Sequence, residues 1–171
     1  MEYGKAFGID FEEIDPDIRE VVYLFNKAGY KTIYSCEGHW HRKEEVKAET
    51  GEESVYPIYD IPYITFEKPD NNLMLNFVIN GMTCMMEIVI NHYLDFKDID
   101  ENDCVDLKQY FANHENAIPT VNIYMSQNIC CAAKNETEFH ELRKKFLQQL
   151  KDMANDLVKC VEACNELNVR I

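Results

Sequence analysis

Residues 29–41 have the sequence Gly29-Tyr-Lys-Thr-Ile-Tyr-Ser-Cys-Glu-Gly-His-Trp-His41. Gly29 predicts the end of a helix, because glycine accepts the left-handed backbone that often closes one. Residues 31–36 alternate in the pattern of a short strand. The densest group of reactive side chains in the chain follows directly. This stretch therefore joins a helix to a strand and predicts a functional site where that strand ends.

The segment before Gly29 predicts a helix with one buried face. Asp15 can cap the free amides at its start, and Pro16 loses no hydrogen bond at the first helical position. Apolar residues then recur at spacings of three and four, at Ile18, Val21, Val22, Leu24 and Phe25. Residues 1–14 are apolar at nearly every second position, which indicates a short strand or a packed arm.

Downstream, three segments carry strand patterns, at residues 59–66, 82–92 and 120–126. Residues 70–80 fit two structures, because they alternate like a strand before the hairpin signal Asn80-Gly81, yet Pro69-Asp70 opens a helix well. We favour a helix here, since the next segment is plainly a strand. Residues 42–54 are charged and predict a mobile loop, and residues 105–111 predict a short helix.

Residues 136–167 predict one long helix, with an apolar stripe from Phe139 to Leu167. At 1.5 Å per residue such a helix is about 48 Å long, whereas a small domain is about 30 Å wide. One end should then overhang the sheet, unless residues 1–14 and 104–111 fold back over it. Because exposed apolar strips mark interfaces, we expect a homodimer formed through this C-terminal helix.

The predicted order is helix, strand, strand, helix, strand, strand, helix. Moving the last strand to the front gives the ferredoxin-like unit in permuted form. We therefore predict a single α+β domain over residues 1–171, with a mostly antiparallel sheet of four or more strands and helices on one face.

Composition excludes several classes of protein. The formal charge is −14, from 31 acidic and 17 basic residues, so broad binding to nucleic acid is not expected. No apolar run is long enough to span a membrane, and no secretory signal starts the chain, so a cytoplasmic protein is expected. The seven cysteines are then free thiols. The basic run Arg143-Lys144-Lys145 could serve a small phosphate-bearing ligand, although solvated surface charge is favoured.

Three interpretations compete for the site. In the first, Cys36, His39 and His41 hold zinc, because thiolate and imidazole are zinc ligands. A fourth ligand would then have to come from elsewhere, the candidates being His92, His114, Cys130 and Cys131. In the second, Cys36 is a nucleophile with a lowered pKa, and Glu37 carries the proton.

The third interpretation is a binding loop in which Gly38 exposes backbone amides and Trp40 offers a flat surface to a ring. This loop takes in Tyr34, Ser35, Cys36, Glu37, Gly38, His39, Trp40 and His41. The simplest alternative is a strand end with a buried Cys36 and solvated histidines.

Several motifs resemble a group of small uncharacterised bacterial and phage proteins. They are Ile14-Asp-Pro-Asp-Ile18, Leu24-Phe-Asn-Lys-Ala-Gly-Tyr-Lys-Thr32, Ser35-Cys-Glu-Gly-His39 and Tyr63-Ile-Thr-Phe-Glu67. This resemblance implies a shared fold, a shared loop and a bacterial or mobile-element origin. Ser35 to His39 is also similar to the Ser-Cys-Ser-Gly-Arg motif of the wybutosine-synthesising methyltransferase family, which would imply S-adenosylmethionine and transfer RNA. His39 replaces the arginine and the chain is acidic, so that activity is not carried over.

We therefore predict a non-enzymatic binding protein that holds a small ligand, such as a nucleotide, or a protein partner at the 35–41 loop. The alternative is a zinc- or thiol-dependent enzyme centred on Cys36, His39 and His41.

Overall fold

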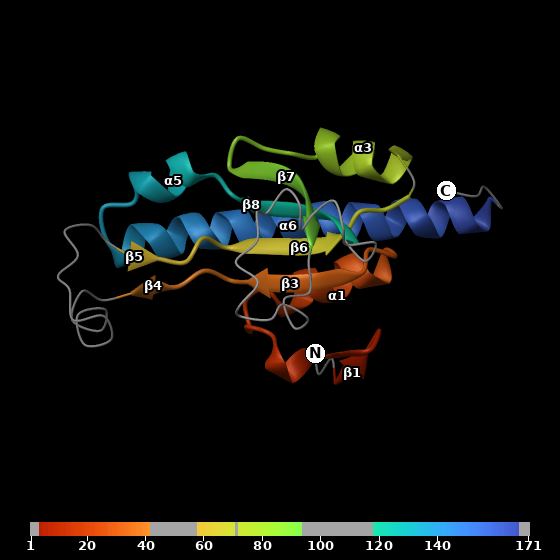
Figure 1. The fold of residues 1–171 in the computed structure, drawn as a ribbon, viewed down its shortest axis with the longest axis horizontal. Helices are drawn as coiled ribbons and strands as arrows, with labels where there is room; N and C mark the ends of the chain where they lie inside the picture. The colour runs from red at the N-terminus through yellow and green to blue at the C-terminus, as the bar shows by residue number, and fades with distance from the viewer. Residues whose placement is uncertain (1–3, 42–57, 71, 94–117, 168–171) are drawn as a thin grey trace, which may run out of the picture.

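The structure, a computed structural model, describes residues 4–41, 58–70, 72–93 and 118–167 (Figure 1). In chain order its elements are β1 (Lys5–Ala6), β2 (Ile9–Asp10), the 3-10 helix η1 (Phe11–Glu13), α1 (Arg19–Lys27), β3 (Thr32–Cys36), β4 (Trp40–His41), β5 (Ile58–Tyr59), β6 (Tyr63–Glu67), α3 (Asn72–Asn80), β7 (Met86–Tyr93), β8 (Ile118–Met125), α5 (Gln127–Ala132) and α6 (Glu136–Glu166). The predicted loop at 42–54 and the predicted helix at 105–111 lie outside the described residues.

Four strands form one antiparallel sheet in the order β3-β6-β8-β7. This is the order that a ferredoxin-like unit has when its first strand is moved to the other end of the chain. Figure 1 shows α1 and α6 on the same side of the sheet, with α6 running behind it roughly along the strands. The predicted α+β class, antiparallel sheet and long C-terminal helix are confirmed.

Alternation along the central strands builds the core between the sheet and these two helices. Ile64 pairs with Ile123, and Phe66 with Val121, so these side chains share the face that the helices cover. Phe66 stacks on Phe25 of α1 at a ring-centroid distance of 5.5 Å. Tyr30, just after α1, meets Phe66 edge-on at 5.0 Å. Aromatic contacts of this kind fix α1, and the chain leading into β3, against the middle of the sheet.

Residues 72–80 form a helix, as favoured from the sequence, and the hairpin alternative is wrong. Leu75 and Val78 are buried, and their three-residue spacing is that of a helix face. The backbone N–H of Gly81 donates to the carbonyl oxygens of Phe77 (3.0 Å) and Val78 (3.1 Å). Gly81 therefore closes the helix instead of turning a hairpin.

The apolar stripe of α6 is covered within one chain over most of its length. The helix has 31 residues and is about 46 Å long. Most of its stripe from Phe139 to Val158 is buried, with Leu142 half-buried, and Lys27 of α1 forms an ion pair with Glu162 at 3.0 Å. Only Leu167, 74% exposed, stands out as an uncovered apolar residue of the described stripe. After Val158 no described residue of this helix is buried, so the expected overhang is confined to its last turns, and the homodimer stays a prediction.

The short strand β4 follows the turn after β3 and was not predicted. Trp40 pairs with Tyr59, and His41 with Ile58, which joins β4 to β5. The predicted strand at 59–66 is thus split near Pro62, because proline cannot donate to a ladder. Among the helices described, none has both the length and the apolar character needed to cross a membrane.

Candidate functional site

The backbone turn at Gly38 carries the chain from β3 to β4. Gly38 has φ of 86°, in the left-handed region. A Cβ at this position would lie 2.8 Å from the Pro62 ring and 3.0 Å from the Asp60 carbonyl oxygen. The N–H of Asp60 in turn donates to the carbonyl oxygen of His39 at 2.8 Å. Glycine is therefore required here, and the turn fixes the residues on either side of it.

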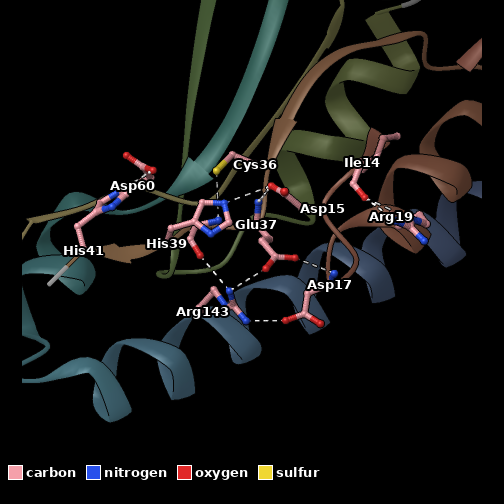
Figure 2. A network of polar contacts seen from close by, with 11 residues as sticks. Ile14, Asp15, Asp17, Arg19, Cys36, Glu37, His39, His41, Asp60 and Arg143 are labelled. Atoms are coloured by element: carbon pink, nitrogen blue, oxygen red, sulfur yellow. Dashed lines mark hydrogen bonds and ion pairs between the residues drawn. The ribbon is translucent and has the colours of Figure 1, made fainter. Parts of the chain in front are cut away.

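Asp15, Cys36 and His39 come together at this turn, and we call them the ligand group. One potential metal-ligating atom from each residue lies within 4.8 Å of the other two. His39 Nε2 is 3.4 Å from Asp15 Oδ2. Figure 2 shows the His39 ring and the Asp15 carboxylate turned toward each other, with the Cys36 sulfur beside them. All three side chains are partly exposed, so an ion could reach them.

Asp15 was missed as a site residue, because it was expected to cap a helix. The helix α1 instead begins at Arg19, with Ile18 as its N-cap and no side-chain cap. The Asp15 carboxylate accepts the backbone N–H of Glu37 at 3.2 Å. Asp15 is therefore turned to the 35–41 loop. The sequence did contain a signal for a second role: Asp15-Pro16-Asp17 carries two carboxylates, whereas a helix cap uses only one.

His41 does not join the ligand group, which corrects the predicted set of Cys36, His39 and His41. Its Nε2 lies 2.9 Å from Asp60 Oδ2 (Figure 2). Cys130 is buried in α5, and Cys131 lies 3.2 Å from the Tyr59 hydroxyl. Within the described part of the chain, no fourth cysteine, histidine or carboxylate completes the group. The remaining fourth-ligand candidates were His92, whose side chain is not described, and His114, outside the described residues.

Glu37 points away from the ligand group and binds Arg143 of α6. Arg143 Nη1 donates to Glu37 Oε1 (3.1 Å) and to the carbonyl oxygen of Gly38 (2.9 Å), while Nη2 donates to Asp17 Oδ2 (2.5 Å). Glu37 Oε2 also accepts the backbone N–H of Asp17 at 2.8 Å. We call Arg143, Glu37, Asp17 and the Gly38 carbonyl the Arg143 network (Figure 2).

This network changes two expectations from the sequence. Glu37, expected to carry a proton for Cys36, has both carboxylate oxygens engaged elsewhere. In the basic run at 143–145, Arg143 is an internal partner of two carboxylates, whereas Lys144 and Lys145 are exposed. A phosphate site built on that run would lack its arginine.

The aromatic residues of the loop region are split between two environments. Trp40, Tyr59 and Phe139 form an aromatic cluster, with ring-centroid distances of 6.2 Å (Trp40–Tyr59), 5.7 Å (Trp40–Phe139) and 5.3 Å (Tyr59–Phe139). Trp40 is therefore packed on the core instead of presented as an open platform. Tyr34 is 47% exposed, and Ser35 lies half-buried between it and Cys36.

Burial, aided by nearby carboxylates, opposes ionisation of the Cys36 thiol. Burial raises the pKa of Cys36, the Gly38 N–H lowers it, and the nearby carboxylates of Asp15, Asp60 and Glu37 raise it again. The net direction is upward, which is opposite to the lowered pKa that a nucleophilic cysteine needs. A cation would reverse this balance, because a bound metal favours the thiolate. The site is thus electrostatically suited to a cation.

No protein-family model matches the chain, and neither the curated proteins nor the solved structures searched contain a significant match. The function is therefore argued from the geometry of the ligand group and its surroundings.

Proposed function

We propose that this protein is a metal-binding protein that holds zinc between Asp15, Cys36 and His39. The single observation that carries the proposal is the ligand group itself, whose three ligand atoms lie within 4.8 Å of one another. In this proposal the 35–41 loop binds the metal, and the metal in turn binds a small ligand.

The chemistry of the three side chains supports zinc over the hard cations. Thiolate and imidazole are ligands for zinc and related transition metals, whereas calcium and magnesium take oxygen ligands. One carboxylate and one thiolate also balance the charge of a divalent ion, while the imidazole stays neutral. The charge of Asp15 and the field at Cys36 both favour the metal-bound state.

The distance between two of the ligand atoms, which face each other as an ion pair, also fits a zinc site. Zinc bonds of about 2.0–2.2 Å to nitrogen and oxygen at tetrahedral angles separate the two ligand atoms by about 3.3–3.5 Å. His39 Nε2 and Asp15 Oδ2 are 3.4 Å apart. Cys36 Sγ lies within 4.8 Å of both atoms, so an approach of about 1 Å brings it to bonding distance of a shared ion.

Three protein ligands leave a tetrahedral ion with one open position. Water or a donor atom of a small ligand would occupy it, which agrees with a binding function for the loop. The enzymatic alternative based on a thiol nucleophile receives no support, because the pKa of Cys36 is raised.

The test is elemental analysis of protein purified without chelators, followed by zinc titration of the metal-free protein. We expect about one zinc per chain in the wild type. Cys36→Ser, Asp15→Asn and His39→Ala should each lose most of the bound zinc. His41→Ala is the matched control, since it removes a histidine from the same loop whose partner is Asp60.

Two outcomes would end the proposal. One is a wild-type protein that takes up no zinc at micromolar concentration. The other is a His41→Ala protein that loses as much zinc as His39→Ala, because that result would favour the set predicted from the sequence.

A further inference from the structure

Arg143 connects the two segments that carry the ligand group. One segment is the turn before α1, with Asp15 and Asp17, and the other is the end of β3 and the turn after it, with Cys36, Glu37 and His39. The guanidinium contacts Asp17 in the first segment and both Glu37 and the Gly38 carbonyl in the second. Through Arg143, both segments are attached to α6 at one point.

The contacts of the guanidinium require an arginine. Two nitrogen atoms serve three acceptors, and this fixed fork cannot be reproduced by the point charge of a lysine. The Arg143 side chain is 14% exposed and that of Glu37 is 11% exposed, so the pair is shielded from water. Shielded charges of this kind are held in a defined geometry.

Stability alone is a poor explanation for this arrangement. Buried ion pairs add little net stability, because removing both charges from water offsets their attraction. Arg143 Nε is also buried without an acceptor among the described residues, which is unfavourable. An arrangement that is costly to bury and geometrically specific points to a role in the neighbouring site.

We propose that Arg143 is the positioning residue of the metal site. It holds the 37–38 peptide against the turn before α1, so that Cys36 and His39 face Asp15. It also ion-pairs with Glu37 and Asp17, which turns these two carboxylates away from the ion and leaves Asp15 and Cys36 as the anionic ligands offered to it. This inference rests on the proposed metal-binding function.

The test is titration with cobalt(II), a spectroscopic substitute for zinc whose visible absorption reports the coordination geometry. Arg143→Gln should weaken cobalt binding about 10–100-fold, the usual effect of losing a residue that orients metal ligands. Its absorption spectrum should also change. Arg143→Lys, which keeps the charge and loses the fork, should weaken binding to a smaller extent.

Lys144→Gln is the matched control, because it removes the same charge from the next residue of α6, which is exposed. Its affinity and spectrum should equal those of the wild type. Glu37→Gln tests the network from its other end. Arg143 and Glu37 act through one contact. The fold-loss of cobalt affinity in the double variant, Arg143→Gln with Glu37→Gln, should therefore be smaller than the product of the fold-losses of the two single variants.

The outcomes separate this inference from the proposed function. If the wild type binds no cobalt and no zinc, both fail. If Cys36→Ser abolishes binding while Arg143→Gln, folded by circular dichroism, keeps the wild-type affinity and spectrum, the role of Arg143 alone is overturned. If Arg143→Gln does not fold, Arg143→Lys decides, and a folded lysine variant with unchanged affinity and spectrum also overturns it.

Discussion

Residues 36–41, from the end of β3 through β4, form a loop region whose two halves are held by different forces. Residues 36–39 are fixed by charges and hydrogen bonds, with Arg143 as the central partner. Residues 40–41 are fixed by strand pairing with β5 and by packing of Trp40 on Phe139. The halves are adjacent in sequence, yet one is polar and geometrically specific while the other is aromatic.

This difference suggests two roles: the aromatic half anchors the loop, and the polar half holds the ligand group in position. We expect burial of the aromatic side chains to supply most of the free energy that holds the loop to α6, because apolar burial dominates folding. The polar half contributes less to stability and more to geometry. Variants of the aromatic half should therefore lower the free energy of unfolding, whereas variants of the polar half should alter the ligand group.

The largest expected loss of stability comes from Phe139→Ala. Phe139 is fully buried and contacts both Trp40 and Tyr59, so the cavity should lower the free energy of unfolding by about 3–5 kcal/mol. Denaturant unfolding measures this loss, and Phe139→Leu should lose less. The folded Phe139→Ala protein should still bind zinc in wild-type stoichiometry. Loss of zinc from the folded variant would show that the two halves are not separable.

Gly38→Ala should have the next largest effect, and it acts on the polar half. The left-handed backbone costs alanine about 1–2 kcal/mol. Crowding of the new Cβ against Pro62 adds about 1–3 kcal/mol. Gly29→Ala is the control. Gly29 also has a left-handed backbone, with φ of 91°, but a Cβ at this position would have no atom within 4 Å apart from its chain neighbours. Gly38→Ala should also weaken zinc binding, and equal losses of stability in both variants would contradict the crowding at Pro62.

A smaller change in the free energy of unfolding should appear at high pH, and it should come from Tyr59, which packs on Trp40. Burial and the contact with Cys131 raise the pKa of Tyr59 to about 12. Unfolded tyrosine ionises near pH 10, so the folded protein retains this proton to higher pH. The contribution of Tyr59 to stability is therefore complete below about pH 10 and is lost as the pH rises to about 12. Tyr59→Phe should unfold with a shallower pH dependence in this range, and identical slopes would contradict the shift.

Periodic residues allowed most of the fold to be predicted. Ile64 and Phe66 alternate in a strand, and Leu75 and Val78 mark a helix face, because local geometry sets both periods. The strands β4 and β5 have two residues each, too few for a period to be visible.

The candidate site was only partly predictable, since its contacts join distant residues. Cys36 and His39 were identified from their chemistry and spacing. Asp15 bonds to a residue 22 positions away, and its local sequence favours a helix cap equally well. The partners of Arg143 lie 106 and 126 positions away, and a basic run gives no indication of them.

The sequence separation within the Arg143 network has a consequence for the order of events during translation. Glu37 and Arg143 are 106 residues apart, and ribosomes add about 5–20 residues per second, so Arg143 is made about 5–20 s after Glu37. Throughout this interval the nascent chain carries the Cys36 thiol, Glu37 and Asp17 without the guanidinium that contacts both carboxylates in the folded protein. Under the proposed role of Arg143, a high-affinity site forms only after α6 has been synthesised, so metal loading would report that both ends of the domain have been made.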